Sequence, residues 1–435
     1  MMDGSSSINR RASIRRIVLI RSMLLAWVCG VFASGWASPT ASADSWRGYR
    51  GDGDGKTDGA IVAPDATATI ETVWKIETPL GFSSFAVDQG IAFTVIARDG
   101  REILLAVDAE TGQPRWERPL GTNQYNGGGG NAGAPNNRGG DGPRSTPTVA
   151  GDLVYVYDAH LKLWAFNVAD GREVWTVDVQ AAHGGRNIKW SNASSPVVDD
   201  DRVFVSGGGT GQTFLCFDGR TGEVIWKTGD DTMTHSTPTL ATIHGKRQVV
   251  FWMKSGLVSL DVRSGQTLWS ETFPFSTSTA ASPVIDGNRI YCSAGYGVGA
   301  GLLEVSPDWT VKEVWFKAND LMNHWSTPVA KDGYLYGIFG FKKYGRAPLQ
   351  CVEMSSGKVM WSQEGFGPGN VIVVGAVVVA LSDAGRVVLA AARPDQYREI
   401  ASDEVLDGKC WSTPAYADGK IFVRSTVAGA CLKVR

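Results

Sequence analysis

The sequence lacks the short motifs that mark the commonest catalytic sites. Its 435 residues contain no G-x-S-x-G nucleophile turn, no H-E-x-x-H zinc helix and no phosphate-binding loop. The motifs therefore give no support to a hydrolase or to a nucleotide-binding protein. No two cysteines are adjacent, which bears on the choice between the functions considered below.

The sequence also lacks an excess of positive charge. The formal net charge of the whole chain is −2, and charged residues make up only 20% of it. Without residues 1–43, the chain has 37 Lys and Arg against 43 Asp and Glu, and its formal charge is −6. Because no basic surface field results from this balance, we expect no nucleic-acid partner.

Residues 1–43 have the pattern of a signal peptide. An apolar run from Met23 to Ala33 follows four arginines, and Ala41-Ser42-Ala43 offers a cleavage site of small residues. The alternative is a membrane anchor, but Arg21 interrupts the apolar stretch and leaves it too short to span a bilayer comfortably. We therefore expect a periplasmic or secreted protein with no stable membrane span. The four arginines are Arg10, Arg11, Arg15 and Arg16.

What the sequence does contain is one hairpin that recurs. In residues 213–228 a short apolar strand is followed by the turn Asp-Gly-Arg-Thr-Gly and by a strand that carries Trp226. An acidic or amide residue stands four positions before a Gly, and the Gly stands four before the Trp. Asp or Asn can bond the backbone of its own turn and Gly accepts a positive φ, so this spacing predicts a β-hairpin. Other copies end at Trp116, Trp175, Trp269 and Trp361, and a degraded copy ends at Trp315.

A second signature, Ser-Thr-Pro or a close variant, opens another strand before each hairpin. Most copies continue through a polar turn into an alternating strand, so one unit has four short antiparallel strands. Units of this kind span residues 83–120, 145–179, 194–230, 236–273, 281–318, 326–365 and 369–405, with Tyr397 in the Trp position of the last. The signature begins at Ser145, Ser194, Ser236, Ala281, Ser326 and Ser412.

The eighth unit is divided between the two ends of the chain. Three strands after Ser412 lack a Trp strand, and Thr72-Val73-Trp74-Lys75 is a Trp strand with nothing before it. Joining them closes a ring and removes the exposed sheet edges of an open array. We therefore predict an all-β fold over residues 44–435, an eight-bladed β-propeller of four-stranded antiparallel blades. Seven blades is the alternative if residues 369–405 do not form a blade.

The repeated tryptophans are interpreted as structural, because one large flat side chain per blade can fill the wedge between neighbouring sheets. Cys216, Cys351 and Cys431 occupy a repeat position that Ala or Ser fills in other copies, so we expect small core residues that do not pair. The structural tryptophans are Trp74, Trp116, Trp175, Trp226, Trp269, Trp315 and Trp361.

Two segments depart from the repeat. Residues 121–142 are rich in Gly and Asn, and we expect a surface loop there, either a flexible spacer or a flap over one face. Residues 52–58, Asp-Gly-Asp-Gly-Lys-Thr-Asp, superficially resemble a Ca²⁺ loop. Lys56 occupies a ligand position, however, and no Glu follows at the bidentate position, so we predict a solvated turn.

The Ser-Thr-Pro strand followed by D-x-x-[ST]-G-x-x-x-W resembles the PQQ-like (pyrrolo-quinoline quinone) β-propeller repeat over nearly all of residues 44–435. Residues 46–55, beginning Trp-Arg-Gly-Tyr-Arg-Gly, are similar to a segment that precedes such propellers in exported bacterial proteins, and residues 142–147 are similar to another phrase of that group. The resemblance implies the fold. It leaves the activity open, because the superfamily contains both quinoprotein dehydrogenases and non-catalytic scaffolds such as the assembly factor BamB.

The resemblance to quinoproteins is incomplete at the positions that carry their chemistry. The best-known quinoproteins have adjacent cysteines joined in a ring over the quinone and a Ca²⁺ held by a Glu, an Asn and a catalytic Asp. No Cys-Cys pair exists in this chain, and the calcium ligands match no motif. We therefore assign no catalytic residue and no metal ligand. PQQ with Ca²⁺ belongs only to the alternative function.

The candidate binding site is a ring at one mouth of the central channel. The two residues before each Ser-Thr-Pro strand differ between copies, and equivalent positions in a propeller surround the channel at one face. An apolar pocket for a small ligand is one hypothesis. A metal site made by His235, His324 and Cys410 is the second, and a plug of side chains is the third. The candidate residues are Arg144, Asn192, His235, His324, Trp325, Cys410 and Trp411, with Trp190 close by in sequence.

Two functions follow from these observations. The first is an exported, monomeric, non-catalytic propeller that binds a protein or a small molecule through one face, as BamB-like scaffolds do. The alternative is a PQQ-dependent oxidoreductase that acts on alcohols or sugars at the channel mouth.

Overall fold

The structure is a computed structural model that describes residues 45–126, 142–340 and 347–435. These residues lie in one compact unit, Thr40–Arg435. The predicted signal peptide and most of the Gly/Asn-rich segment 121–142 lie outside the described residues, so their predictions remain predictions. The only helix in the described part is α1 (Val179–His183), and no helix there is long and apolar enough to cross a bilayer.

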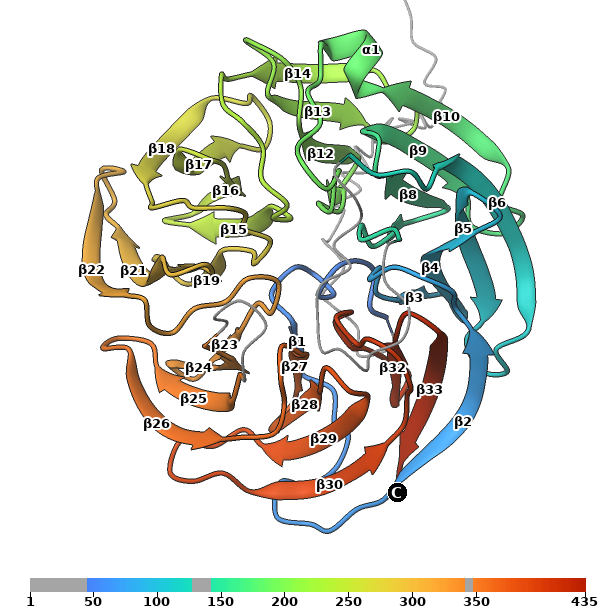
Figure 1. Cartoon of the computed structure of the whole chain (residues 1–435). Coiled ribbons are helices and arrows are strands. Elements are labelled where there is room, and N and C mark those ends of the chain that lie inside the picture. Colours follow the sequence, from blue (N-terminus) through green and yellow to red (C-terminus); the bar gives the residue numbers. More distant parts are fainter. Residues whose placement is uncertain (1–44, 127–141, 341–346) are drawn as a thin grey trace, which may run out of the picture. The chain divides into compact units, whose positions relative to one another are not determined.

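The described residues form eight sheets arranged as blades around a common axis, with the first strand of each blade nearest the axis (Figure 1). Blades 1 to 4 comprise β3 (Ala86–Asp88), β4 (Ile91–Arg98), β5 (Arg101–Asp108) and β6 (Pro114–Thr122); β7 (Thr148–Ala150), β8 (Leu153–Tyr157), β9 (Lys162–Asn167) and β10 (Glu173–Asp178); β11 (Val197–Asp199), β12 (Arg202–Ser206), β13 (Phe214–Asp218) and β14 (Val224–Thr228); and β15 (Thr239–Ile243), β16 (Lys246–Trp252), β17 (Gly256–Asp261) and β18 (Thr267–Thr272).

The remaining blades complete the circle. Blades 5 to 8 comprise β19 (Val284–Asp286), β20 (Arg289–Ala294), β21 (Gly299–Val305) and β22 (Val311–Ala318); β23 (Val329–Lys331), β24 (Tyr334–Ile338), β25 (Leu349–Glu353) and β26 (Lys358–Gln363); β27 (Asn370–Val374), β28 (Val377–Leu381), β29 (Arg386–Ala391) and β30 (Glu399–Glu404); and β31 (Ala415–Ala417), β32 (Lys420–Arg424), β33 (Ala428–Val434) and β2 (Ile70–Glu77). The prediction of eight four-stranded antiparallel blades is confirmed, and residues 369–405 do form a blade.

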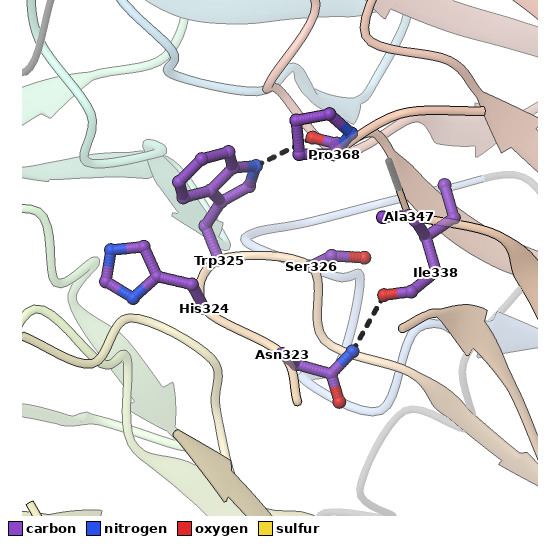
Figure 2. A pocket seen from close by; sticks show the side chains of 7 residues that line it. All are labelled: Asn323, His324, Trp325, Ser326, Ile338, Ala347 and Pro368. Atoms are coloured by element: carbon purple, nitrogen blue, oxygen red, sulfur yellow. Dashed lines mark hydrogen bonds between the residues drawn. The ribbon is translucent and has the colours of Figure 1, made fainter. Parts of the chain in front are cut away.

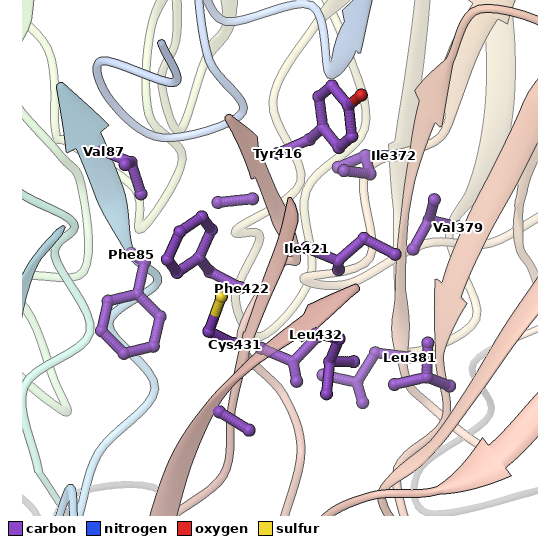
Figure 3. Packing of buried hydrophobic residues seen from close by; sticks show 14 of the residues in the cluster. Phe85, Val87, Ile372, Val379, Leu381, Tyr416, Ile421, Phe422, Cys431 and Leu432 are labelled. Carbon is purple, nitrogen blue, oxygen red and sulfur yellow. The ribbon is translucent and has the colours of Figure 1, made fainter. Parts of the chain in front are cut away.

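Ring closure occurs where the sequence predicts it. Strand β2 pairs antiparallel with β33, and Trp74 lies opposite Cys431. The neighbouring core is continuous across this junction, since Phe85 of blade 1, Phe422 and Leu432 of blade 8 and Val379 of blade 7 belong to one buried cluster (Figure 3). The two ends of the described chain therefore share one sheet.

The turn of the recurrent hairpin packs against the tryptophan of the preceding blade. In blade 3, Asp218 Oδ1 accepts hydrogen bonds from the backbone N–H groups of Arg220 and Thr221, and Gly222 has φ 73°. A Cβ on Gly222 would lie 2.8 Å from the ring of Trp175 in blade 2, so this position needs glycine for close approach as well as for φ. The Trp175 Nε1 donates to the carbonyl of Gly219 in the same turn, at 2.8 Å.

The same contact joins most neighbouring blades, and the tryptophans are accordingly structural. The indole N–H groups of Trp74, Trp116, Trp226, Trp315 and Trp361 donate to a backbone carbonyl in the turn of the following blade. Trp269 is the exception, because blade 5 has the degraded turn. Its Nε1 donates to Gln248 in its own blade, and His244 instead reaches Val305 of blade 5 through a ring nitrogen.

The sequence analysis was wrong about Tyr397. A one-residue bulge precedes the Trp position in every blade, and in blade 7 the register places Ala401 opposite Leu389, where other blades have Trp. Tyr397 lies before β30 and packs edge-on against Trp361 of blade 6, with ring centroids 5.5 Å apart. It therefore fills the same wedge from outside the strand.

The predicted solvated turn at residues 52–58 is right for Asp52 to Asp54, which lie in turns, and wrong for Lys56 and Thr57, which form a strand. Residues 46–57 together form a strap across the axis. Trp46 bridges Val87 of blade 1, and β1 (Lys56–Thr57) adds a parallel strand to β27 of blade 7 (Figure 1). Between them Arg50 is fully buried and donates to the carbonyls of Thr327 and Pro328 of blade 6. Asp52 and Asp58 alone remain exposed among the acidic residues of this segment.

Candidate functional site

A belt of hydroxyl groups fixes the chain where each blade begins. The backbone N–H of Ser84 donates to Thr146 Oγ1, that of Thr146 to Ser195 Oγ, and that of Ser195 to Thr237 Oγ1, all at 2.9–3.0 Å. The same kind of bond joins blade 5 to blade 6, where the N–H of Ser282 donates to Thr327 Oγ1 at 3.0 Å, and blade 8 to blade 1, where that of Thr413 donates to Ser84 Oγ at 2.8 Å. The Ser-Thr-Pro signature thus supplies an acceptor for the preceding blade, which holds the residues just before it around one end of the axis.

Blade 7 has no Ser-Thr-Pro, and two tryptophans meet beside its first strand. Trp325 Nε1 donates to the carbonyl of Pro368 at 2.9 Å, and Asn370 Nδ2 donates to the carbonyl of Trp411 at 2.6 Å. The two indole rings stack, with centroids 4.2 Å apart and planes inclined by 31°. Trp411 Nε1 also donates to Asp383 Oδ1, which fixes this ring in the core.

Further aromatic rings continue this stack on both sides. Phe82 of blade 1 lies 4.9 Å from Trp411, and His324 lies 5.1 Å from Trp325. Tyr296 meets His324 edge-on at 4.9 Å. We call Phe82, Tyr296, His324, Trp325 and Trp411 the aromatic stack; its members come from the segments that lead into blades 1, 6 and 8 and from the β20–β21 connection.

The aromatic stack leaves little free volume. A cavity beside Trp325, lined by Asn323, Ser326 and Pro368 among others, holds about 10 Å³, which is room for a single water molecule (Figure 2). Asn323 Nδ2 donates to the carbonyl of Ile338 in its wall. Beside Trp325 the described residues thus leave no room for a ligand larger than water, and the choice between pocket and plug for the whole mouth stays a prediction.

A second group of candidate residues lies toward blades 2 to 4. Arg144 lies over the ring of Tyr125 at 5.5 Å and donates to the carbonyl of Trp190. Trp190 packs on His235 at 6.2 Å. Asn192 is buried and bonds the backbone of Tyr157, Asp158 and Ser194, so its role is to shape the loop.

His235 is held as a neutral imidazole of defined tautomer. Its Nε2 donates to the carbonyl of Lys189 at 3.1 Å, and Nδ1 accepts from Ser278 Oγ at 3.0 Å. Burial lowers the pKa of His235 to about 4, with a further contribution from the charge of Arg144. Burial likewise lowers the pKa of His324 to about 3, and His235 adds to this effect. The two histidines therefore lie close enough to interact.

The predicted residues do not form a metal centre. No group of three or more His, Cys, Asp or Glu is arranged to hold a metal ion within residues 45–126, 142–340 and 347–435. Cys410 is buried, and burial raises the pKa of its thiol far above the usual range, which is unfavourable for a thiolate ligand or nucleophile. The five cysteines of these ranges are all free and buried.

Sequence reasoning missed several polar residues at this mouth. Glu102 is fully buried, with Tyr125 Oη donating to its Oε1 at 2.9 Å, and burial raises its pKa to about 8. Lys409 is buried with its ammonium 4.9 Å from the ring of Trp411. The available signal was weak: Glu102 interrupts an otherwise apolar strand, and Lys409 directly precedes two residues already selected.

Acidification should destabilise the protein through the two histidines. The unfolded imidazoles titrate near pH 6.5, whereas the folded ones stay neutral down to about pH 4, so the unfolded state binds more protons in that window. Stability then falls as the pH drops from 6.5 toward 4. His324→Phe keeps the ring contacts and cannot be protonated, so we expect it to lose about 1–3 kcal/mol less than the parent over this range.

The measurement is urea unfolding of the parent and His324→Phe at both ends of the window, with His160→Phe outside the aromatic stack as the control. Glu102 acts with opposite sign, because its raised pKa makes the folded state bind the additional proton. The variant is therefore compared with the parent at each pH. An identical pH slope for His324→Phe and the parent would contradict the assignment.

The blades, the docking hairpin and the hydroxyl belt define a β-propeller of the PQQ-like repeat class. The sequence matches the family described as outer membrane protein assembly factor BamB over residues 57–191 and 139–363, which together exceed half of the chain. The chain belongs to this family. No curated protein matches it in sequence.

Solved structures agree with the fold. The quinohemoprotein alcohol dehydrogenase from Comamonas testosteroni is 13% identical with a TM-score of 0.66, and the alignment covers 90% of this chain and 81% of that one. BamB from Moraxella catarrhalis is 13% identical with a TM-score of 0.57, covering 84% and 99%. The quinohemoprotein alcohol dehydrogenase from Pseudomonas putida HK5 is 12% identical with a TM-score of 0.65, covering 90% and 80%. At these identities the likeness concerns the fold alone.

Proposed function

We propose that this chain is an exported, non-catalytic propeller that binds another protein through the face that carries the channel mouth. The observation that carries the proposal is the aromatic stack, where Trp325 and Trp411 pack on each other and leave about 10 Å³ of space. The half-buried rings of Tyr296 and Trp325, which rest on buried members of the stack, suit recognition of a partner from outside. The family, described as an assembly factor, is consistent with such a role.

The residues of the mouth do not fit a quinone. Sites for ligands of that size enclose roughly 300 Å³ or more. The cavity beside Trp325 is far smaller, and the facing sides of the Trp325 and Trp411 rings cover each other. Lys409, which lies 4.9 Å from the ring of Trp411, is buried. The alternative, a PQQ-dependent oxidoreductase acting on alcohols or sugars, therefore receives no support from the geometry of this mouth.

Export to the periplasm or beyond is part of the proposal. It is supported by the signal-peptide pattern of residues 1–43 and by the description of the family as outer-membrane assembly factors. We further propose that the protein acts as a monomer. We also propose that it does not bind nucleic acid, since its formal charge without residues 1–43 is −6.

Addition of PQQ and Ca²⁺ to the purified protein should leave the quinone absorbance unchanged and produce no dye reduction with alcohols or sugars. A quinoprotein dehydrogenase handled in parallel verifies the reagents. A tight quinone complex, or turnover above the dye background, would replace the scaffold proposal with the oxidoreductase.

A further inference from the structure

Cationic side chains lie over several aromatic rings at the mouth. The guanidinium of Arg144 lies 5.5 Å from the ring of Tyr125, and the ammonium of Lys189 lies 4.8 Å from that of Trp190. Lys409 makes the third such pair with Trp411, at 4.9 Å. Each pair is a favourable contact in itself. Lys409 and Trp411 are buried, so the aromatic and cationic surface of the mouth consists of the other two pairs, with Lys189 exposed and Arg144 half-buried.

Three buried carboxyl groups lie behind this surface, and each accepts hydrogen bonds from the fold. Glu102 is fully buried, and because burial raises its pKa to about 8 it is mostly protonated at neutral pH. Asp383 is buried and accepts a hydrogen bond from the indole N–H of Trp411. Asp158 is buried and accepts from the backbone of His160 and Lys162 and from Trp164 Nε1. Asp407 is exposed near Cys410, in the segment that leads into blade 8.

Two aromatic residues of the mouth are held in a costly backbone conformation. Trp190 has φ 69° and Tyr296 has φ 58°, in the left-handed region that bulky side chains avoid at a cost of roughly 1–2 kcal/mol each. Both are half-buried, and their rings lie over His235 and His324 respectively. Strained backbone that presents a half-exposed ring is typical of a recognition site.

We propose that this mouth binds an acidic peptide segment that contains an aromatic residue. The aromatic side chain of the peptide lies on the half-exposed rings of Trp190 and Trp325, and its carboxylates face Arg144 and Lys189. Charge complementarity selects an acidic over a basic segment, and ring stacking selects aromatic over aliphatic side chains. This inference rests on the proposed function, since it names the class of partner for the same face.

The test is an array of immobilised peptides about eight residues long, in which acidic and aromatic content vary independently. The full purified chain is expected to bind acidic peptides with Phe, Tyr or Trp about tenfold more tightly than peptides with Lys in place of Asp or Ala in place of the aromatic residue. Binding should weaken as salt is added, because exposed charges such as Lys189 are screened.

Two variants connect this selectivity to the mouth. Lys189→Gln removes an exposed charge that lies over the ring of Trp190, and Trp325→Ala removes a half-buried ring. Each should lower the affinity about fivefold to tenfold. Lys358→Gln, on the exposed rim strand β26, is the matched control and should bind as the parent does. Circular dichroism verifies that each variant is folded.

The outcomes separate the two proposals. Binding that ignores peptide charge, or that survives Lys189→Gln and Trp325→Ala unchanged, overturns the inference and leaves the scaffold function standing. The same holds if no peptide of the array is retained. A tight PQQ complex in the experiment above overturns the scaffold function itself.

Discussion

Replacing Trp74 with alanine is expected to lower the free energy of unfolding by about 3–5 kcal/mol. The side chain is buried between blades 8 and 1, where it contacts Phe85 and Phe422 at centroid distances of 6.2 and 5.9 Å. Its indole N–H also donates to the carbonyl of Ala109, which the truncation leaves without this partner. Trp74 belongs to β2, so the lost contacts are those that hold the ring-closing strand in place.

Val73 provides the matched control for Trp74. It is the neighbouring residue of β2, sits in the bulge and is 42% exposed, so Val73→Ala should change the free energy of unfolding by less than about 0.5 kcal/mol. Urea unfolding measures the free energy of unfolding of both variants. It is followed by the circular dichroism of the backbone, because tryptophan fluorescence changes when Trp74 is removed. Hydrogen exchange should show β2 opening first in Trp74→Ala. Equal stability losses in the two variants would mean that Trp74 does not hold the closure.

The blades could be predicted because each one repeats the same local chemistry. Asp218, Gly222 and Trp226 are related by fixed spacing, and each makes its contact within its own hairpin or with that of a neighbouring blade. The repeat also predicts how the ring closes. The C-terminal part has three strands of a blade and the N-terminal part has the missing Trp strand, so together they form one complete blade. Tyr397 was assigned wrongly because blade 7 lacks the Asp and Gly spacing that fixes the Trp position in other blades. Its aromatic residue stands four positions before Ala401, which the register places opposite Leu389.

The parts that occur once could not be predicted in this way. The strap depends on Arg50 meeting carbonyl groups more than 270 residues away, and no spacing in the sequence encodes that contact. The positions of the mouth residues followed from the repeat. Whether Trp325 and Trp411 would stack or stand apart depends on Asp383 and Pro368, which fix the two indole N–H groups.

Two buried arginines connect segments that occur only once in the chain to the ring of blades. Arg50 joins the strap to blade 6, and Arg424 of β32 joins blade 8 to blade 1 and to the turn after β2. Neither has an ion pair with a carboxylate in the described part of the chain, and both are surrounded by backbone carbonyls. Such a cation satisfies several acceptors that secondary structure leaves unpaired, which is why an arginine is used at a junction of irregular segments.

Arg424→Met should therefore cost about 3–5 kcal/mol of unfolding free energy, because it removes the only charge in a buried polar cluster and leaves its acceptors unpaired. In the parent, the guanidinium donates to the carbonyls of Ser83 and Val95 at 3.0 and 2.6 Å and to Thr94 Oγ1 at 2.9 Å. It also donates to the carbonyl of Leu80. Burial lowers the pKa of Arg424 to about 9, so the cation still persists at neutral pH.

Arg115→Met is the control for the loss of an arginine as such. Arg115 pairs with Asp108 at 2.7 Å on the surface, where its side chain is 44% exposed, and exposed pairs of this kind contribute about 0–1 kcal/mol. Urea unfolding of both variants near neutral pH gives the comparison. If Arg424→Met loses no more stability than Arg115→Met, the carbonyls at the junction of blades 8 and 1 find other donors, and the closure depends on Trp74 and its apolar neighbours alone.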